Sequence, residues 1–218
     1  MNFPSDKQRL TIVGATGSGK TQAAMWHLSR RDYLSRPWIV YDYKYDSMIN
    51  QIEGAIHIAV TDEPPTQPGI YIVHPDPGEV DEVASQMWQI WKQENIGVYI
   101  DEGYMVGNNN RAFRTLLTQG RSKHIPMIIL SQRPVWMDKF VFTESEFFQV
   151  FRLQNTRDIK NVGEFIPHDI TKRLPEYYSY YYDAPDDSLV ILKPVPNENV
   201  ILDTFSMRLQ TLKIKTAI

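Results

Sequence analysis

The sequence predicts an α/β protein with a mainly parallel central sheet flanked by helices. Short apolar, β-branched runs alternate with segments of helical composition along most of the 218 residues. This alternation is typical of a parallel sheet that helices cover on both faces. The first apolar run leads into a glycine-rich loop and then a helix, which is the strand–loop–helix order of a phosphate-binding unit. Apolar residues make up 42% of the chain, which favours a packed core over a disordered chain.

The first half of the chain is expected to contain five strands and two helices. The first helix, over 21–28, follows the glycine-rich loop. The second, over 79–94, has apolar residues that recur on one face. Prolines between two of the strands predict a loop over 61–68. The expected strands are 10–13, 37–42, 55–60, 69–73 and 96–100.

The second half continues the same pattern. A turn over 107–110 precedes a helix over 111–119 that ends near Gly120. Strands are expected over 126–130, 147–153 and 188–192. We interpret residues 1–218 as a single P-loop domain, with a core of about 9–155 and C-terminal strands and tail over 156–218. The tail from Pro194 onward is left open, an arm against a neighbouring subunit being one interpretation.

A tyrosine-rich stretch over 177–182 has five tyrosines in six residues. The favoured interpretation is a strand packed in the core with solvated hydroxyl groups. Stacking on nucleic acid or lining an interface are the alternatives.

Composition excludes several classes of protein. The chain has no cysteine, so disulfides and thiolate zinc sites are excluded. Its five histidines lack metal-ligand spacing, and its net charge of −3 provides no overall positive field for nucleic acid. The N-terminus lacks an apolar signal core, and no run approaches the roughly 18 apolar residues that span a bilayer. No transmembrane segment is therefore expected.

The stretch GATGSGKT at 14–21 matches the phosphate-binding loop motif. Glycines allow successive backbone N–H groups to turn toward phosphate oxygens, because no Cβ blocks the required dihedral angles. Lys20 is expected to reach the β- and γ-phosphates, and the Thr21 hydroxyl to bind Mg²⁺. The alternative is a glycine-rich turn that binds nothing. The predicted nucleotide-binding residues are Gly14, Ala15, Thr16, Gly17, Ser18, Gly19, Lys20, Thr21 and Gln22.

Two carboxylates and an amide at later strand ends complete the predicted site. Asp101, at the end of an apolar strand, is placed to order Mg²⁺, and the adjacent Glu102 to polarise an attacking water. Gln132, after the next strand, is placed to contact that water and the γ-phosphate. The alternatives are a surface acidic pair and a glutamine that merely closes a hydrogen bond at a strand end.

Five motifs follow one another at a characteristic spacing. They are GATGSGKT at 14–21, VYDYK at 40–44, YIDE at 99–102, GRSKHIP at 120–126 and SQRP at 131–134. Over about 10–153, this order resembles the FtsK–HerA superfamily, whose members are RecA-like (ASCE) P-loop ring ATPases that pump double-stranded DNA. A short chain without a winged-helix tail is most similar to one branch, the genome-packaging ATPases of tailless icosahedral viruses with an internal membrane.

The resemblance implies a role for particular residues. Lys20 and Thr21 match the Walker A pair, Asp101 and Glu102 match the Walker B pair, and Gln132 matches the polar sensor. Arg121 matches the position from which an arginine finger enters the neighbouring subunit's site, with Arg133 as the alternative. Asp42 and Lys44 are placed beside the site without an assigned role.

The resemblance also implies a function, an ATP- and Mg²⁺-dependent motor that translocates double-stranded viral DNA into a preformed capsid. It implies a homo-oligomeric ring, expected to be a hexamer, that acts with capsid-vertex or membrane-associated packaging proteins. The expected location is the host cytoplasm during assembly, or the virion at a packaging vertex. Non-sequence-specific DNA contacts are expected from Asn108, Arg111 and Arg114 in the segment after Glu102, and an ordinary solvated loop is the alternative there.

Three other functions remain open from the sequence. The first is a related FtsK–HerA-type DNA pump or a phage-assembly or conjugation ATPase. The second is a small-molecule P-loop kinase, which Glu102 disfavours because a kinase does not need a water-activating carboxylate. The third is a non-enzymatic nucleotide-binding protein.

Overall fold

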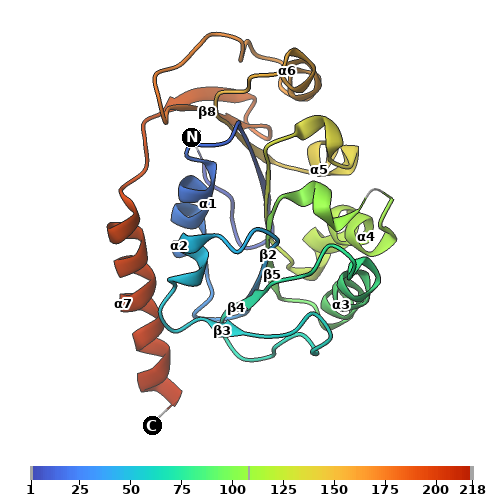
Figure 1. The fold of residues 1–218 in the computed structure, drawn as a ribbon, viewed down its shortest axis with the longest axis vertical. Coiled ribbons are helices and arrows are strands. Elements are labelled where there is room, and N and C mark those ends of the chain that lie inside the picture. Colours follow the sequence, from blue (N-terminus) through green and yellow to red (C-terminus); the bar gives the residue numbers. More distant parts are fainter. Residues whose placement is uncertain (1, 108, 217–218) are drawn as a thin grey trace.

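The computed structural model describes residues 2–107 and 109–216 (Figure 1). The strands are β1 (Arg9–Val13), β2 (Pro37–Asp42), β3 (Ile56–His57), β4 (Gly69–Val73), β5 (Gly97–Asp101), β6 (Met127–Ser131), β7 (Phe147–Val150), β8 (Ser179–Asp183) and β9 (Ser188–Leu192). The α-helices are α1 (Lys20–Ser29), α2 (Ser47–Asn50), α3 (Val80–Gln93), α4 (Arg111–Gln119), α5 (Lys139–Thr143), α6 (Thr156–Gly163) and α7 (Glu198–Thr216). Short 3₁₀ helices are η1 (Gly103–Val106), η2 (Gly120–Lys123) and η3 (Pro134–Trp136).

In the described part of the chain, the strands form one sheet in the order β3-β4-β2-β5-β6-β1-β7-β8-β9. Pairing is parallel from β3 through β7, and β8 and β9 are added antiparallel at one end. The carboxyl ends of β1, β2, β5 and β6 therefore meet at one edge of the sheet, where open α/β sheets bind ligands. The predicted fold class, a mainly parallel sheet flanked by helices, is confirmed.

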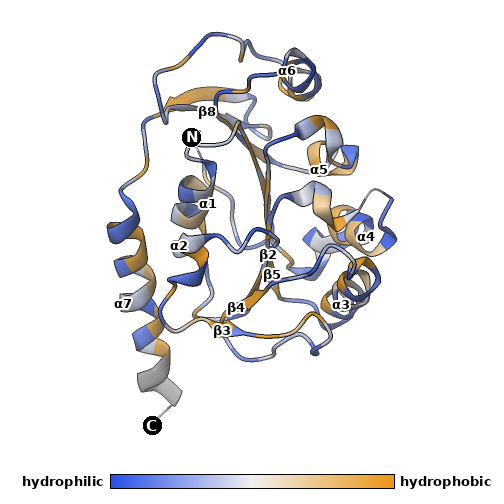
Figure 2. Ribbon diagram, in the orientation of Figure 1, coloured by the Kyte–Doolittle hydropathy of each residue, from blue (hydrophilic) through white to orange (hydrophobic). Residues whose placement is uncertain are grey.

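Helices cover both faces of the sheet. Figure 1 shows α1, α2 and α7 on one side and α3, α4 and α5 on the other. The central strands β1, β2, β4, β5 and β6 are buried along their whole length. Figure 2 shows hydrophobic residues along β2, β4 and β5. Burial on both faces explains why these strands read as continuous apolar runs rather than alternating ones.

One close approach in the centre of the sheet requires a glycine. A Cβ placed at Gly97, the first residue of β5, would lie 2.1 Å from the indole ring of Trp38 in β2. Trp38 is fully buried, and its Nε1 donates to Asp32 Oδ1 at 3.0 Å. Gly97 therefore leaves room for the Trp38 ring where β2 pairs with β5, the two strands whose carboxyl ends carry acidic residues of the site.

The structure differs from the sequence-based expectations in several segments. The strand expected over 55–60 is reduced to the two residues of β3, an exposed edge strand. The short helices α2, α5 and α6 were not expected from the sequence. The tail, which the sequence left open, forms α7, which contacts α1 of the same chain and buries Ile201, Phe205 and Leu209. These three residues recur every four positions, which is the spacing of one helix face. Contact of this helix with a neighbouring subunit stays a prediction.

The tyrosine-rich stretch forms β8, as the favoured interpretation predicts. Its residues Tyr180, Tyr181 and Tyr182 are at most 7% exposed. Their hydroxyl groups bond to other protein groups rather than only to solvent, since Tyr180 donates to the Lys172 carbonyl and Tyr181 to the Asn2 carbonyl. These bonds leave each hydroxyl oxygen able to accept from water, so the expectation of solvated hydroxyls stays a prediction. Tyr177 lies before the strand and remains exposed.

None of the helices in the described ranges is long and apolar enough to cross a membrane.

Candidate nucleotide site

The glycine-rich loop lies between β1 and α1 and is tied to the neighbouring strands. The Gly14 amide donates to the Ser131 carbonyl at the end of β6, and the Ala15 amide to the Arg152 carbonyl after β7. Gly17 and Gly19 have φ angles of 71° and 95°, a left-handed conformation that residues with a Cβ rarely adopt. Glycine therefore occupies the two positions of the motif at which the loop backbone is left-handed.

Lys20 is the first residue of α1 and lies beneath the loop. It is 4% exposed, and burial, followed by the nearby Lys44 ammonium, lowers the pKa of Lys20. No side chain caps the N-terminus of α1, and its first turn has no acidic residue. The N-terminal N–H groups of α1 and the Lys20 ammonium thus favour a bound anion at this position. Thr21 follows as the second residue of the helix.

Asp101 ends β5 as a fully buried carboxylate. Among the described residues, neither of its side-chain oxygens has a hydrogen-bond partner, and the Lys44 Nζ lies 3.8 Å from its Oδ2. Burial raises the pKa of Asp101 to about 7. Buried polar groups in proteins normally have a hydrogen-bond partner or a bound ion. Carboxylate and hydroxyl oxygens are hard donors, which Mg²⁺ prefers as ligands. Asp101 together with the Thr21 hydroxyl fits a hydrated Mg²⁺ ion.

In the described ranges, no group of three or more His, Cys, Asp or Glu side chains could hold a metal ion.

Glu102 is connected to the phosphate loop through Gln132. Its φ angle of 66° turns the chain sharply after β5, and its side chain is buried. Glu102 Oε2 accepts from the Gln132 backbone N–H at 3.1 Å. The Gln132 Oε1 accepts in turn from the Thr16 hydroxyl at 2.5 Å. The phosphate loop, Gln132 and Glu102 therefore form one chain of contacts, as their positions at adjacent strand ends predict.

Lys44 contacts Glu102 directly, a position that the sequence interpretation did not specify. Its ammonium group contacts Glu102 Oε1. Lys44 reaches this position because Asp42, at the end of β2, is in register with Asp101 of β5. The buried Asp42 carboxylate accepts from the backbone N–H groups of Lys44 and Asp46, which shapes the loop. The VYDYK motif, which spans the end of β2, placed Lys44 beside the site but did not indicate its partner.

The two candidate arginines lie at opposite edges of the sheet. Arg133 is beside Gln132, with its Nε 3.1 Å from Asp158 Oδ2 and its guanidinium 4.3 Å from the Trp136 ring centre. Arg121, in η2 before β6, has a side chain that is 66% exposed and lies 3.8 Å from Glu146 Oε1. A five-residue strand is about 17 Å long. Arg121 is thus too far to act on its own chain's phosphate loop, and a role in a neighbouring subunit's site remains a prediction.

The predicted DNA-contact residues have different environments. Arg111 begins α4 and is exposed. Arg114 is paired with Asp138 and donates to the Asn109 side chain, so its charge is compensated within the domain. Asn108 lies outside the described residues. The assignment of these three residues to DNA contacts stays a prediction.

The fold and the site define a P-loop NTPase. A solved structure of the genome packaging NTPase B204 from Sulfolobus turreted icosahedral virus 2, in complex with ATP-gammaS, is similar with a TM-score of 0.66 at 15% identity, over 88% of this chain and 100% of that one. EssC from Geobacillus thermodenitrificans (ATPases 2 and 3) is similar with a TM-score of 0.63 at 13% identity, over 96% of this chain and 44% of that one. No protein-family model matches the chain.

The chain is similar in sequence to one known protein over almost its whole length. It is 46% identical over 226 aligned positions to the DNA packaging ATPase P9 of Enterobacteria phage PRD1, covering 97% of this chain and 99% of that protein. The chain belongs to the DNA packaging ATPase family. The predicted resemblance to the packaging branch of the FtsK–HerA superfamily is confirmed.

Proposed function

We propose that this protein is an Mg²⁺-dependent ATPase that translocates double-stranded viral DNA into a preformed capsid. The observation that carries the proposal is the chain of contacts from Thr16 through Gln132 to Glu102, beside a buried Asp101 that accepts no hydrogen bond from the described residues. This arrangement joins a phosphate loop to a water-activating carboxylate. Its occurrence in a member of the DNA packaging ATPase family indicates what the hydrolysis is used for.

The residues at the carboxyl edge of the sheet bind and hydrolyse ATP. The loop amides and Lys20 hold the β- and γ-phosphates. Thr21 and Asp101 hold Mg²⁺, which neutralises charge on the phosphates when bound. Glu102 accepts a proton from the attacking water, a role that requires its carboxylate to turn from Lys44 toward the γ-phosphate. Gln132 contacts the phosphate loop and Glu102 and therefore senses γ-phosphate loss.

Arg121 acts on the site of a neighbouring subunit in a homo-oligomeric ring, which we propose to be a hexamer. Its exposure and its position at the amino edge of the sheet support this role. Exposed cations such as Arg111 face DNA in the ring and contact phosphates without reading bases. The ring acts with capsid-vertex or membrane-associated packaging proteins, in the host cytoplasm or at a packaging vertex of the virion.

Steady-state ATP hydrolysis, measured against protein concentration with and without double-stranded DNA, tests this function. Because two subunits share each site, specific activity is expected to rise with concentration and to increase further with DNA. Turnover that is independent of both concentration and DNA would contradict the motor. Turnover that transfers phosphate to a nucleoside or metabolite rather than to water would indicate a kinase.

A further inference from the structure

Tyr177 is an exposed aromatic residue that packs on the phosphate loop. It is 54% exposed, in contrast to the buried tyrosines of β8 that follow it. A Cβ placed at Gly19 would lie 3.2 Å from Cδ1 of Tyr177 and 3.7 Å from Cε1 of Phe151. The ring therefore lies against the residue that precedes the catalytic lysine. No role for Tyr177 follows from the hydrolysis mechanism.

The backbone at Tyr177 is held in an uncommon conformation. Its φ angle is 63°, which is a genuine outlier for a bulky side chain. The Tyr178 backbone N–H donates to the Pro175 carbonyl at 3.2 Å, and this turn fixes Tyr177 over the loop. Strained positions of this kind persist where the surrounding structure demands them, and they cluster at ligand-binding sites.

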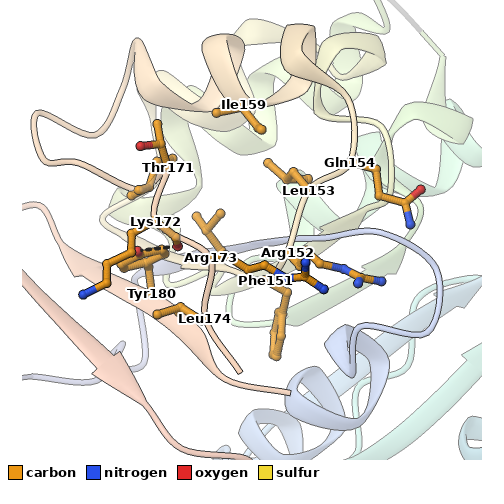
Figure 3. A pocket seen from close by; sticks show the side chains of 12 residues that line it. Phe151, Arg152, Leu153, Gln154, Ile159, Thr171, Lys172, Arg173, Leu174 and Tyr180 are labelled. Atoms are coloured by element: carbon orange, nitrogen blue, oxygen red, sulfur yellow. Dashed lines mark hydrogen bonds between the residues drawn. The ribbon is translucent and has the colours of Figure 1, made fainter. Parts of the chain in front are cut away.

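Tyr177 lines two pockets. One, of about 270 Å³, is also lined by Gly19, Gln22, Phe151 and Asn197. The other, of about 240 Å³, is also lined by Gly17, Ser18 and two arginines, Arg152 and Arg173. The same two arginines line a third cavity, of about 290 Å³, that lies next to α6 and is drawn in Figure 3.

The order of the phosphates decides which pocket faces the nucleoside. The γ-phosphate end of the site is marked by Glu102 and Gln132, which meet the beginning of the loop at Thr16. The α-phosphate and the nucleoside must then leave from the other end of the motif, at Gly19 and Gln22. These two residues line the larger of the two pockets beside Tyr177, which is therefore in position for a base and ribose.

The C-terminal part of the chain closes this pocket. The Gln22 side-chain amide donates to the Pro196 carbonyl at 2.6 Å, so the segment between β9 and α7 is attached to the end of the motif. Lys193, Val195 and Asn197 of that segment line the pocket together with Tyr177. The pocket thus combines one exposed aromatic face with a few polar groups, as small-molecule sites do.

We propose that Tyr177 is the stacking platform for the base of the bound nucleoside triphosphate, and that the segment over 193–197 forms the opposite wall of this base pocket. The inference rests on the proposed ATP-binding function of the phosphate loop. Stacking on an aromatic face tolerates any base, because every base has a π-face. The pocket therefore supplies affinity for a nucleoside triphosphate over a bare polyphosphate, rather than strict selection of adenine.

Equilibrium binding to two probes tests the base pocket, Mg-ATP and Mg-tripolyphosphate, which lacks a nucleoside. Tyr177→Ala is expected to weaken ATP binding by roughly ten- to a hundredfold while leaving tripolyphosphate binding within about twofold. Tyr177→Asn also removes the ring, but asparagine tolerates the left-handed conformation at this position. This variant should therefore lose the same ATP affinity as Tyr177→Ala without a folding defect. Tyr177→Phe keeps the ring and should bind both probes as the parent does. Trp88→Ala, an exposed aromatic on the far helix α3, is the matched control and should change neither affinity.

Two results would overturn the inference. Unchanged ATP affinity in Tyr177→Ala and Tyr177→Asn would show that the ring does not contact the base. An equal loss for ATP and tripolyphosphate would mean that Tyr177 only supports the loop at Gly19. The readout is binding alone, so a parent protein that binds ATP but does not respond to DNA would contradict the proposed motor without affecting this result.

Discussion

The two edges of the parallel sheet differ in how their buried charged groups are hydrogen-bonded. At the amino edge, the buried Arg9 side chain bonds to the Glu144 carbonyl and to Glu146, and the Arg36 guanidinium pairs with Asp32. At the carboxyl edge, the buried Asp101 has no hydrogen-bond partner among the described residues. Paired charges at the amino edge hold strands and loops together. Asp101 has only the Lys44 ammonium nearby, at 3.8 Å, so its oxygens remain able to bind a ligand.

Arg121 is the exception at the amino edge, because its side chain is exposed. Arg121→Ala should therefore lower turnover by roughly 10³–10⁵ in the assembled protein, the range for arginine fingers, while ATP binding stays unchanged. The measurement is kcat at saturating ATP with double-stranded DNA. Lys123→Ala, in the same 3₁₀ helix but paired with Glu94, is the matched control and should retain activity. Full activity in Arg121→Ala would remove this residue from the mechanism.

Glu102→Gln tests the carboxyl edge. It should lower kcat by roughly 10²–10⁴, the contribution of a general base, and leave the dissociation constant for ATP close to that of the parent. Lys20→Ala, by contrast, should weaken nucleotide binding itself. Glu94→Gln makes the same chemical change at the amino edge and should have little effect. A Glu102→Gln protein with parental turnover would show that another group activates the water.

Arg9→Met tests whether the amino edge is structural. Removing one partner of the buried Arg9–Glu146 pair should lower the free energy of unfolding by about 3 kcal/mol, because Glu146 then keeps only the more distant and exposed Arg121 as a cationic partner. Denaturant unfolding measures this change. ATP turnover per folded molecule should remain, and an unchanged midpoint would contradict the structural role.

A buried histidine outside both edges gives the expected pH dependence of stability. Burial lowers the pKa of His27 to about 4 from 6.5, so its neutral form is favoured in the folded protein. Between pH 6.5 and about 4, the unfolded chain binds a proton that the folded chain does not. Stability should therefore fall as the pH falls through this window, by about 3 kcal/mol at pH 4. His27→Gln should show a correspondingly smaller slope, and an identical slope in both proteins would be inconsistent with a neutral His27.

Asp101→Asn should give the smallest change in stability, and of the opposite sign to Arg9→Met. Replacing a buried carboxylate that lacks a hydrogen-bond partner should raise the free energy of unfolding by about 1 kcal/mol, although the Lys44 contact is lost. Hydrolysis should be lost at the same time. A destabilised Asp101→Asn protein would mean that the Lys44 contact contributes more than the burial costs.

The sequence predicted those parts of the fold and site whose residues are tied to local backbone rules. The glycine spacing at 14–19 requires a particular loop, and the apolar runs before Asp101 and Gln132 are buried strands. Helix α7 was not predicted because its buried positions Ile201, Phe205 and Leu209 are interspersed with exposed apolar residues such as Val200 and Met207. Which of these residues are buried depends on the packing of α7 against α1. The contact of Lys44 with Glu102 depends on the pairing of β2 with β5, which no local pattern contains.

Mixing two inactive variants tests most directly whether the site is shared between subunits. Arg121→Ala subunits keep Glu102, and Glu102→Gln subunits keep Arg121, so a mixed ring contains some interfaces with both residues intact. A mixture of the two is expected to recover DNA-stimulated ATP hydrolysis well above the sum of the separate variants. A mixture that stays at that sum, while assembling as the parent does, would contradict a site completed by the neighbouring subunit.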